Sequence, residues 1–216
     1  MSYAKIRLED YLTTIYRLEE ALGIARIKEL SSELGVSPAT ASKVIKKLEE
    51  KGLVTREKYH YIKLTDKGRG LAEAIIRKHR IAELFLSKIL DFNDYEAHYY
   101  AHYFEHLPDT IIERIYRLLD YPSACPHGNP LPGTNYTEKG EFIRLSEASE
   151  GSKCTVKRLL GELRDVLKYI VSASIKVNTS LTILSKSSDS IQVSIENTKE
   201  VTIPTRIAYY ILVKCE

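Results

Sequence analysis

The chain has 216 residues, of which 44% are hydrophobic and 28% are charged, and its formal net charge is +3. These values are typical of a soluble globular protein with one large domain or two to three small ones. The three widely spaced cysteines argue against a secreted disulfide framework. We find neither a signal peptide nor an apolar run of the roughly 20 residues that span a bilayer. We therefore expect a cytoplasmic protein with no membrane partner.

Helices and a short ribbon are expected in the first 90 residues. Apolar residues recur at helical spacing, and Gly35 stops the second helix. Ser37 and Pro38 form a typical helix start, a capping side chain followed by proline in the first turn. The expected elements are helices over residues 6–18, 27–34 and 37–51, strands over 52–55 and 59–64, and a long helix from the cap at 65–66 to about 90.

Beyond residue 90 the pattern changes twice. Two shorter helical patterns lie between residues 93 and 119, and four of the chain's 7 prolines fall within 121–140, which marks a connector. In the last part, apolar and polar residues alternate as they do in β-strands, which predicts a small β-barrel. Its expected strands cover residues 180–184, 191–195, 201–203 and 209–213, with one helix over about 157–171. We expect a mainly α protein with a β C-terminal part, in domains of residues 1–65, 66–140 and 141–216.

The order of helix, tight turn, helix and ribbon is that of a winged helix-turn-helix, whose second helix fits the DNA major groove. Between residues 36 and 65, seven basic side chains stand against three acidic ones, so positive charge is concentrated where phosphates would lie. Alternatively, the lysines pair with Glu49 and Glu50 on a solvated face, or the unit binds protein. Paired half-sites in operator DNA favour a homodimer. The expected DNA contacts are Ser37, Pro38, Ala39, Thr40, Ser42, Lys43, Lys46, Lys47, Arg56 and Lys58.

Five of the 6 histidines lie in the middle third of the chain. If residues 98–106 form one helix, an arc of about 100° presents three imidazoles and a carboxylate, from His98, His102, Glu105 and His106. On the preceding helix, His79 and Glu83 are four residues apart and share a face. Cys125 and His127 add a thiol and an imidazole. These groups are transition-metal ligands, so the pattern predicts metal binding.

Other interpretations stay open at this point. The histidines could be structural in a winged-helix regulator that answers a small organic ligand. The metal could instead be catalytic, in a hydrolase that carries a DNA-binding domain. We find no nucleophile elbow, P-loop or glycine-rich dinucleotide fingerprint, so we do not expect an enzyme. Tyr99, Tyr100 and Tyr103 could pack at a dimer interface or in the domain's own core.

Four segments resemble blocks of the diphtheria toxin repressor family, which includes iron-dependent and manganese-transport regulators. They are residues 9–16 (EDYLTTIY), 37–42 (SPATAS), 78–83 (KHRIAE) and 125–132 (CPHGNPLP). The resemblance covers essentially the whole chain, and the C-terminal region is similar to the family's SH3-like, ferrous-transport-A-type domain. It implies a repressor that binds operator DNA as a homodimer when loaded with Fe²⁺ or Mn²⁺ and that controls metal uptake genes. The sign of the regulation is open, since an activator would share these features.

The resemblance also implies metal ligands. One site would use Asp10, His102, Glu105 and His106, and a second would use His79, Glu83 and His98. Some members instead build a site that here would use Glu83, Cys125 and His127 with Asp165 or Glu162. Two positions depart from the family pattern: His102 replaces a cysteine or glutamate, and Thr13 replaces a carboxylate of manganese-type members. Co²⁺, Ni²⁺ and Zn²⁺ therefore stay open beside Fe²⁺ and Mn²⁺.

Overall fold

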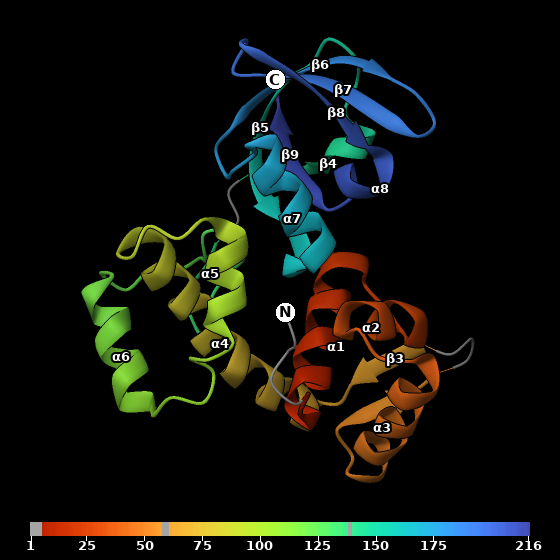
Figure 1. Ribbon diagram of the computed structural model, residues 1–216, viewed down its shortest axis with the longest axis vertical. Coiled ribbons are helices and arrows are strands. Elements are labelled where there is room, and N and C mark those ends of the chain that lie inside the picture. The colour runs from red at the N-terminus through yellow and green to blue at the C-terminus, as the bar shows by residue number, and fades with distance from the viewer. Residues whose placement is uncertain (1–5, 58–60, 138–139) are drawn as a thin grey trace. The chain divides into compact units, whose positions relative to one another are not determined.

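The computed structural model describes residues 6–57, 61–137 and 140–216 (Figure 1). The chain forms two compact units, and the boundary between them follows Lys78, inside the long helix α4 (Asp66–Lys88). No helix in the described part of the chain is long and apolar enough to cross a membrane.

The first unit is a winged helix-turn-helix, as the sequence predicts (Figure 1). Its sheet is antiparallel, with β3 between β1 and β2. Strand β1 is an addition that the sequence pattern did not predict, and the first two residues of the expected strand 59–64 lie outside the described residues. The elements are α1 (Leu8–Leu22), β1 (Ala25–Arg26), α2 (Ile27–Leu34), α3 (Pro38–Glu50), β2 (Val54–Arg56) and β3 (Tyr61–Leu64).

The turn between α2 and α3 follows from local sequence. Gly35 ends α2 in the left-handed region, with φ 65°, where glycine meets no Cβ clash. Ser37 then caps α3, because its Oγ accepts the backbone N–H of Thr40 at 3.1 Å, and Pro38 occupies the first turn. One face of α3 packs into the core through Ala41, Ile45 and Leu48. The opposite face is left to solvent.

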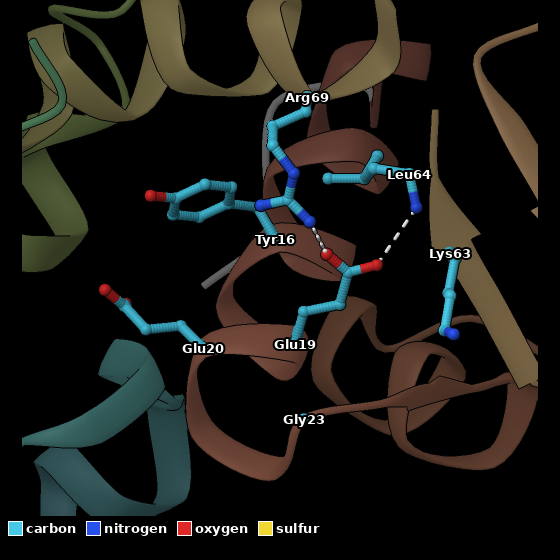
Figure 2. Close-up of a pocket in the computed structure, with 7 residues that line it drawn as sticks. All are labelled: Tyr16, Glu19, Glu20, Gly23, Lys63, Leu64 and Arg69. Atoms are coloured by element: carbon cyan, nitrogen blue, oxygen red, sulfur yellow. Dashed lines mark hydrogen bonds and ion pairs between the residues drawn. The ribbon is translucent and has the colours of Figure 1, made fainter. Parts of the chain in front are cut away.

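One carboxylate joins α1 to the wing and to the start of α4. Figure 2 shows Glu19 between the Arg69 side chain and the backbone nitrogen of Leu64. Its Oε1 accepts the Leu64 N–H at 2.9 Å, and Arg69 donates to Oε2. The Glu19 side chain is only 11% exposed, so water screens this pair less than a surface ion pair. Helix α1, the wing and the first turn of α4 are therefore fixed to one another.

The second unit combines the rest of α4 and four further helices with an antiparallel sheet (Figure 1). The strand order is β4-β9-β5-β6-β7-β8. This arrangement confirms the expected fold class, mainly α with a β C-terminal part. The helices are α5 (Asp94–Ala101), α6 (Asp109–Leu118), α7 (Arg164–Ala173) and α8 (Thr205–Ala208), with 3₁₀ turns η2 (Leu145–Glu147) and η3 (Leu160–Glu162). The strands are β4 (Ile143–Arg144), β5 (Lys153–Leu159), β6 (Ser180–Lys186), β7 (Ser190–Ile195), β8 (Lys199–Pro204) and β9 (Ile211–Cys215).

Two local expectations in this region are wrong. The helix expected over residues 157–171 begins only at Arg164, and residues 157–159 belong to β5. A short apolar run of this kind fits strand and helix spacing equally well, and the pairing of β5 with β9 decides for the strand. Cys154 and Cys215 also form a disulfide, which the cysteine spacing did not indicate. They occupy paired positions of β5 and β9, with Cα atoms 4.0 Å apart.

Candidate metal centre and DNA-binding surface

The histidine stripe does not lie on one helix. Helix α5 ends at Ala101, and the next N–H groups bond to carbonyls three residues back, from Tyr103 at 3.1 Å and Phe104 at 2.9 Å. The expected single arc over 98–106 is therefore wrong, because the chain tightens into turns after α5 instead of continuing the helix. These turns direct Glu105 inward and leave His106 exposed.

Three imidazoles meet near Glu105, and we call His79, His98 and His102 the three-histidine cluster. One nitrogen of each ring lies within 4.8 Å of the others. Glu105 Oε1 lies 2.8 Å from Nδ1 of His79 and 2.9 Å from Nδ1 of His102. Burial raises the pKa of Glu105, but hydrogen bonds from His102 and His79 outweigh burial and hold this pKa far below its usual range. The cluster thus combines three nitrogens with an ionised carboxylate.

A second group contains Glu83, Cys125, His127 and Glu162, and we call it the Glu–Cys–His–Glu cluster. All four residues are buried, and one ligand atom of each lies within 4.8 Å of the others. Cys125 Sγ is 3.3 Å from Glu162 Oε1, and His127 Nδ1 is 3.4 Å from Glu83 Oε2. Glu83 also reaches the three-histidine cluster, since its Oε1 lies 2.8 Å from His98 Nδ1.

The connector loop over residues 123–132 supplies the thiol and the imidazole. Its carbonyl at His127 accepts the N–H of Leu159 at 2.9 Å, which fixes the loop to β5. Gly128 makes this approach possible: a Cβ there would lie 2.2 Å from the Lys157 carbonyl oxygen, and its φ is 77°. Residues 123–132 are therefore part of the site.

The protonation states of Glu83, His127 and Cys125 set the charge of the Glu–Cys–His–Glu cluster. Burial raises the pKa of Glu83, but the charges of His127 and His79 outweigh burial and hold it well below its usual range. Burial opposes charging of His127, yet the Glu83 carboxylate raises the pKa of His127 to about 9. Burial, reinforced by the charge of Glu162, raises the pKa of the Cys125 thiol well above its ordinary value. At neutral pH the cluster holds an ionised Glu83, a protonated His127 and a neutral thiol.

The residues present fit a divalent transition metal. Two fully buried atoms lack a well-formed hydrogen bond to any described residue: His127 Nε2, and Glu83 Oε2, whose one contact is the 3.4 Å ion pair with His127 Nδ1. Buried polar atoms are nearly always satisfied, so these two atoms inside a group of metal-type ligands fit a site for a metal ion. A thiolate, an imidazole and two carboxylates suit Fe²⁺, Co²⁺ or Zn²⁺, and the carboxylates also suit Mn²⁺.

The structure brings together the residues of two expected sets. His79, Glu83 and His98 have ligand atoms 2.8–3.1 Å apart, and Glu83, Cys125 and His127 lie with Glu162. The difference is that His102, expected in the site of Asp10, lies with His79 and His98. Of the two acids considered from the β region, Glu162 is in the cluster and the Asp165 side chain is 75% exposed. Asp10 belongs to the first unit, where its Oδ2 accepts the backbone N–H of Arg7 at 2.7 Å. Its role as a ligand with His102, Glu105 and His106 stays a prediction.

Sequence reasoning missed two polar residues of the cluster. Arg80 is fully buried and donates from Nε to Glu162 Oε1 at 2.8 Å. Asn129 is also fully buried and donates to the same oxygen at 3.0 Å. Both residues lie inside the sequence segments that resemble the family, close in sequence to predicted metal ligands. That closeness could have identified them as neighbours of the site.

The surface expected to contact DNA is accessible. All eight candidates from the start and middle of α3 are exposed: Ser37, Pro38, Ala39, Thr40, Ser42, Lys43, Lys46 and Lys47. The structure does not pair the α3 lysines with Glu49. Glu49 instead forms an ion pair with Arg56, whose Nη2 lies 2.7 Å from Glu49 Oε2. Arg56 remains exposed, and Lys58 lies outside the described residues.

Comparisons with known families cover nearly the whole chain. Residues 6–62 match the model described as "Iron dependent repressor, N-terminal DNA binding domain". Residues 65–133 match "Iron dependent repressor, metal binding and dimerisation domain", and residues 143–215 match "FeoA domain". The boundaries 1–65, 66–140 and 141–216 stay a prediction.

Individual relatives and solved structures agree with these matches. The chain is 31% identical to the diphtheria toxin repressor of Corynebacterium efficiens, over 82% of this chain and 83% of the relative. It is 29% identical to the iron-dependent repressor IdeR of Mycobacterium tuberculosis, over 95% of this chain and 96% of the relative. The structure of a manganese-dependent transcriptional repressor with manganese is similar at 32% identity and a TM-score of 0.79, covering 96% of this chain and 99% of that one. The T. acidophilum IdeR structure has 26% identity and a TM-score of 0.84, covering 99% of this chain and 100% of that one. The chain belongs to the diphtheria toxin repressor family of metal-dependent transcription repressors, as the sequence motifs predict.

Proposed function

We propose that the protein is a metal-activated repressor that binds operator DNA as a homodimer and controls metal uptake genes. The observation that carries this proposal is the pair of buried ligand clusters in the same chain as an exposed, basic recognition helix. The relatives named for iron or manganese favour Fe²⁺ or Mn²⁺ as the activating ion. The nitrogen-rich three-histidine cluster keeps Co²⁺, Ni²⁺ and Zn²⁺ as alternatives.

The three-histidine cluster with Glu105, and the Glu–Cys–His–Glu cluster, would hold the ions. A bound ion would supply a fixed positive charge to imidazole and thiol groups that otherwise carry protons. The clusters are connected to the DNA-binding unit by one helix. Helix α4 begins directly after the wing, where Thr65 Oγ1 accepts the N–H of Gly68 at 3.1 Å, and it carries His79 and Glu83 further along. Asp10 on α1 remains the predicted ligand from the DNA-binding unit.

Metal and DNA would be coupled by linkage. If the ion binds the DNA-competent arrangement more tightly than others, it raises DNA affinity, and DNA raises metal affinity by the same factor. The exposed Lys43, Lys46 and Lys47 have no ion pair to any described residue, so they are available for phosphates.

The dimer face would lie around the aromatic residues of α5 and the turns after it. In the described chain, seven of the 12 exposed large apolar side chains fall between residues 89 and 121. Tyr100 is 39% and Tyr103 59% exposed, and their rings pack 6.5 Å apart. This concentration of exposed apolar side chains lies in the region that matches a metal-binding and dimerisation domain. It favours a second copy of the chain as the partner that buries this surface. Replacing Tyr103 with lysine should weaken the dimer in sedimentation experiments, whereas lysine at Ile143, an exposed apolar residue of β4, should not.

A matched pair of variants tests the metal switch. Glu105→Gln keeps the size of the side chain but removes the charge between His79 and His102. Glu113→Gln makes the same change at an exposed position of α6. We expect Glu113→Gln to retain metal-stimulated binding of a labelled operator, and Glu105→Gln to lose most of the stimulation while its dimer stays folded. Wild-type stimulation in Glu105→Gln contradicts the assignment.

We propose a binding function and not a catalytic one, since every residue of the two ligand clusters except His102 is buried. Operator DNA as the target favours action in the cytoplasm. Turnover of a phosphate or amide substrate by the Zn²⁺-loaded protein would instead support a hydrolase. Purification without bound metal, together with operator binding that no ion changes, would support a regulator that answers another ligand.

A further inference from the structure

Arg80 is a permanent charge that is sealed inside the second unit. It follows His79 on α4 and is 0% exposed. Its Nε donates to Glu162 Oε1 at 2.8 Å, and its Nη1 donates to the carbonyl of Pro130 at 2.6 Å. A guanidinium stays protonated in proteins and binds in a fixed fork geometry. Arg80 therefore connects α4 to the connector loop and to η3 through directional bonds.

Glu162 is the one residue of the Glu–Cys–His–Glu cluster that comes from the FeoA-matched region. It is 1% exposed, and its backbone is left-handed, with φ 47°. This conformation is unfavourable for a non-glycine residue, and it persists where the surroundings determine it strongly. The bonds from Arg80 and Asn129 to Oε1 are such surroundings.

The charges favour a role in metal binding. With a divalent ion bound to the cluster, Glu83, Glu162 and a Cys125 thiolate would contribute three negative charges and the ion two positive ones. One negative charge would remain uncompensated in a buried site, which is costly. Arg80 supplies the missing positive charge at hydrogen-bond distance from a ligand carboxylate.

We propose that Arg80 is a positioning residue of the Glu–Cys–His–Glu cluster, which holds the Glu162 carboxylate in place as a metal ligand and balances the charge of the loaded site. This inference rests on the proposed metal-binding function. Arg80 does not bind the ion itself; it acts through Glu162. Removing either residue should therefore have the same effect, and removing both should have no further effect.

A double-mutant cycle with Co²⁺ alone tests this role in the full-length protein. Co²⁺ affinity is measured by competition with a chelator, and the thiolate-to-cobalt charge-transfer absorption reports binding at Cys125, the free cysteine of the described chain. We expect Arg80→Met and Glu162→Gln each to weaken Co²⁺ binding at this site by about tenfold or more. The double variant should bind no more weakly than either single variant, and Arg80→Lys, which keeps the charge, should restore part of the affinity.

The controls separate the inference from the function on which it rests. Arg114→Met removes an exposed guanidinium from α6 and should bind Co²⁺ as the wild type does. If Glu162→Gln weakens binding but Arg80→Met does not, or if the two losses add, the role of Arg80 is refuted while the metal site stands. If Glu162→Gln changes neither affinity nor absorption, Glu162 is not a ligand and both proposals fail for this cluster. Should Arg80→Met not fold, the same cycle is run with Arg80→Lys, and additive losses refute the role there as well.

Discussion

Metal uptake by the Glu–Cys–His–Glu cluster should release two protons per ion. Without metal, His127 keeps its proton at neutral pH because Glu83 raises the pKa of His127 to about 9, and burial keeps Cys125 a neutral thiol. A metal needs the neutral imidazole and the thiolate, so both protons must leave, while the lowered pKa of Glu83 means that it has none to lose. Affinity should therefore fall as pH falls.

The magnitude follows from the proton count. Each released proton changes the free energy of binding by about 1.4 kcal/mol per pH unit, so two protons change the metal affinity about 100-fold per unit. This slope should hold between pH 6.5 and 8, below both raised pKa values. Above pH 9, where His127 has lost its proton in the free protein, the slope should decrease toward one proton.

Co²⁺ titrations at several pH values would measure this slope, with the thiolate-to-cobalt absorption as the signal specific to Cys125. Cys125→Ser is the matched control, since a serine hydroxyl binds without releasing its proton, and chelator competition should then give a slope of about one. Affinity that does not vary with pH between 6.5 and 8, or an equal slope in Cys125→Ser, refutes this account of the protonation states.

Three further changes have defined outcomes. Gly128→Ala would place a Cβ 2.2 Å from the Lys157 carbonyl oxygen at a φ of 77°. The free energy of unfolding, measured by thermal denaturation, should therefore fall by about 1–3 kcal/mol. An unchanged melting temperature would mean that the loop does not pack as described. Lys47→Ala should weaken operator binding and lower the slope of log affinity against log salt by about 1.8, because each protomer of the dimer loses one phosphate contact, and an unchanged slope would remove Lys47 from the interface. Cys215→Ser removes a disulfide whose cysteines are 61 residues apart, so urea unfolding should show a loss of up to about 4 kcal/mol relative to the oxidised protein; equal stability under oxidising conditions would contradict a formed Cys154–Cys215 bond.

The winged helix could be predicted because its signals are local. Gly35, the Ser37 cap and Pro38 fix the turn and the start of α3 within a few residues, and no distant contact is needed to interpret them. The order of elements then identified the fold class, and the family resemblance agreed with it.

The composition of the ligand clusters could be predicted, and the family resemblance implied part of their grouping, but not the meeting of His102 with His79 and His98. Residue type and helical spacing selected the histidines and Glu83, whereas the end of α5 at Ala101 changed which of them meet. The choice of Glu162 over Asp165 depends on how η3 docks against the connector loop, and the sequence holds no local signal for that contact. The Cys154–Cys215 pair likewise depends on strand register over 61 residues.

The most direct test of the central claim is the effect of metal on operator binding. A labelled palindromic duplex, selected from a randomised pool by the protein with and without metal, is titrated with chelator-stripped protein and followed by fluorescence anisotropy. Fe²⁺, Mn²⁺, Co²⁺, Ni²⁺ and Zn²⁺ are then compared at fixed salt. The account predicts that at least one ion raises affinity tenfold or more, a coupling of about 1.4 kcal/mol or above. Equal affinity with and without every ion would contradict it and leave a winged-helix DNA-binding protein whose buried ligand clusters do not control DNA binding.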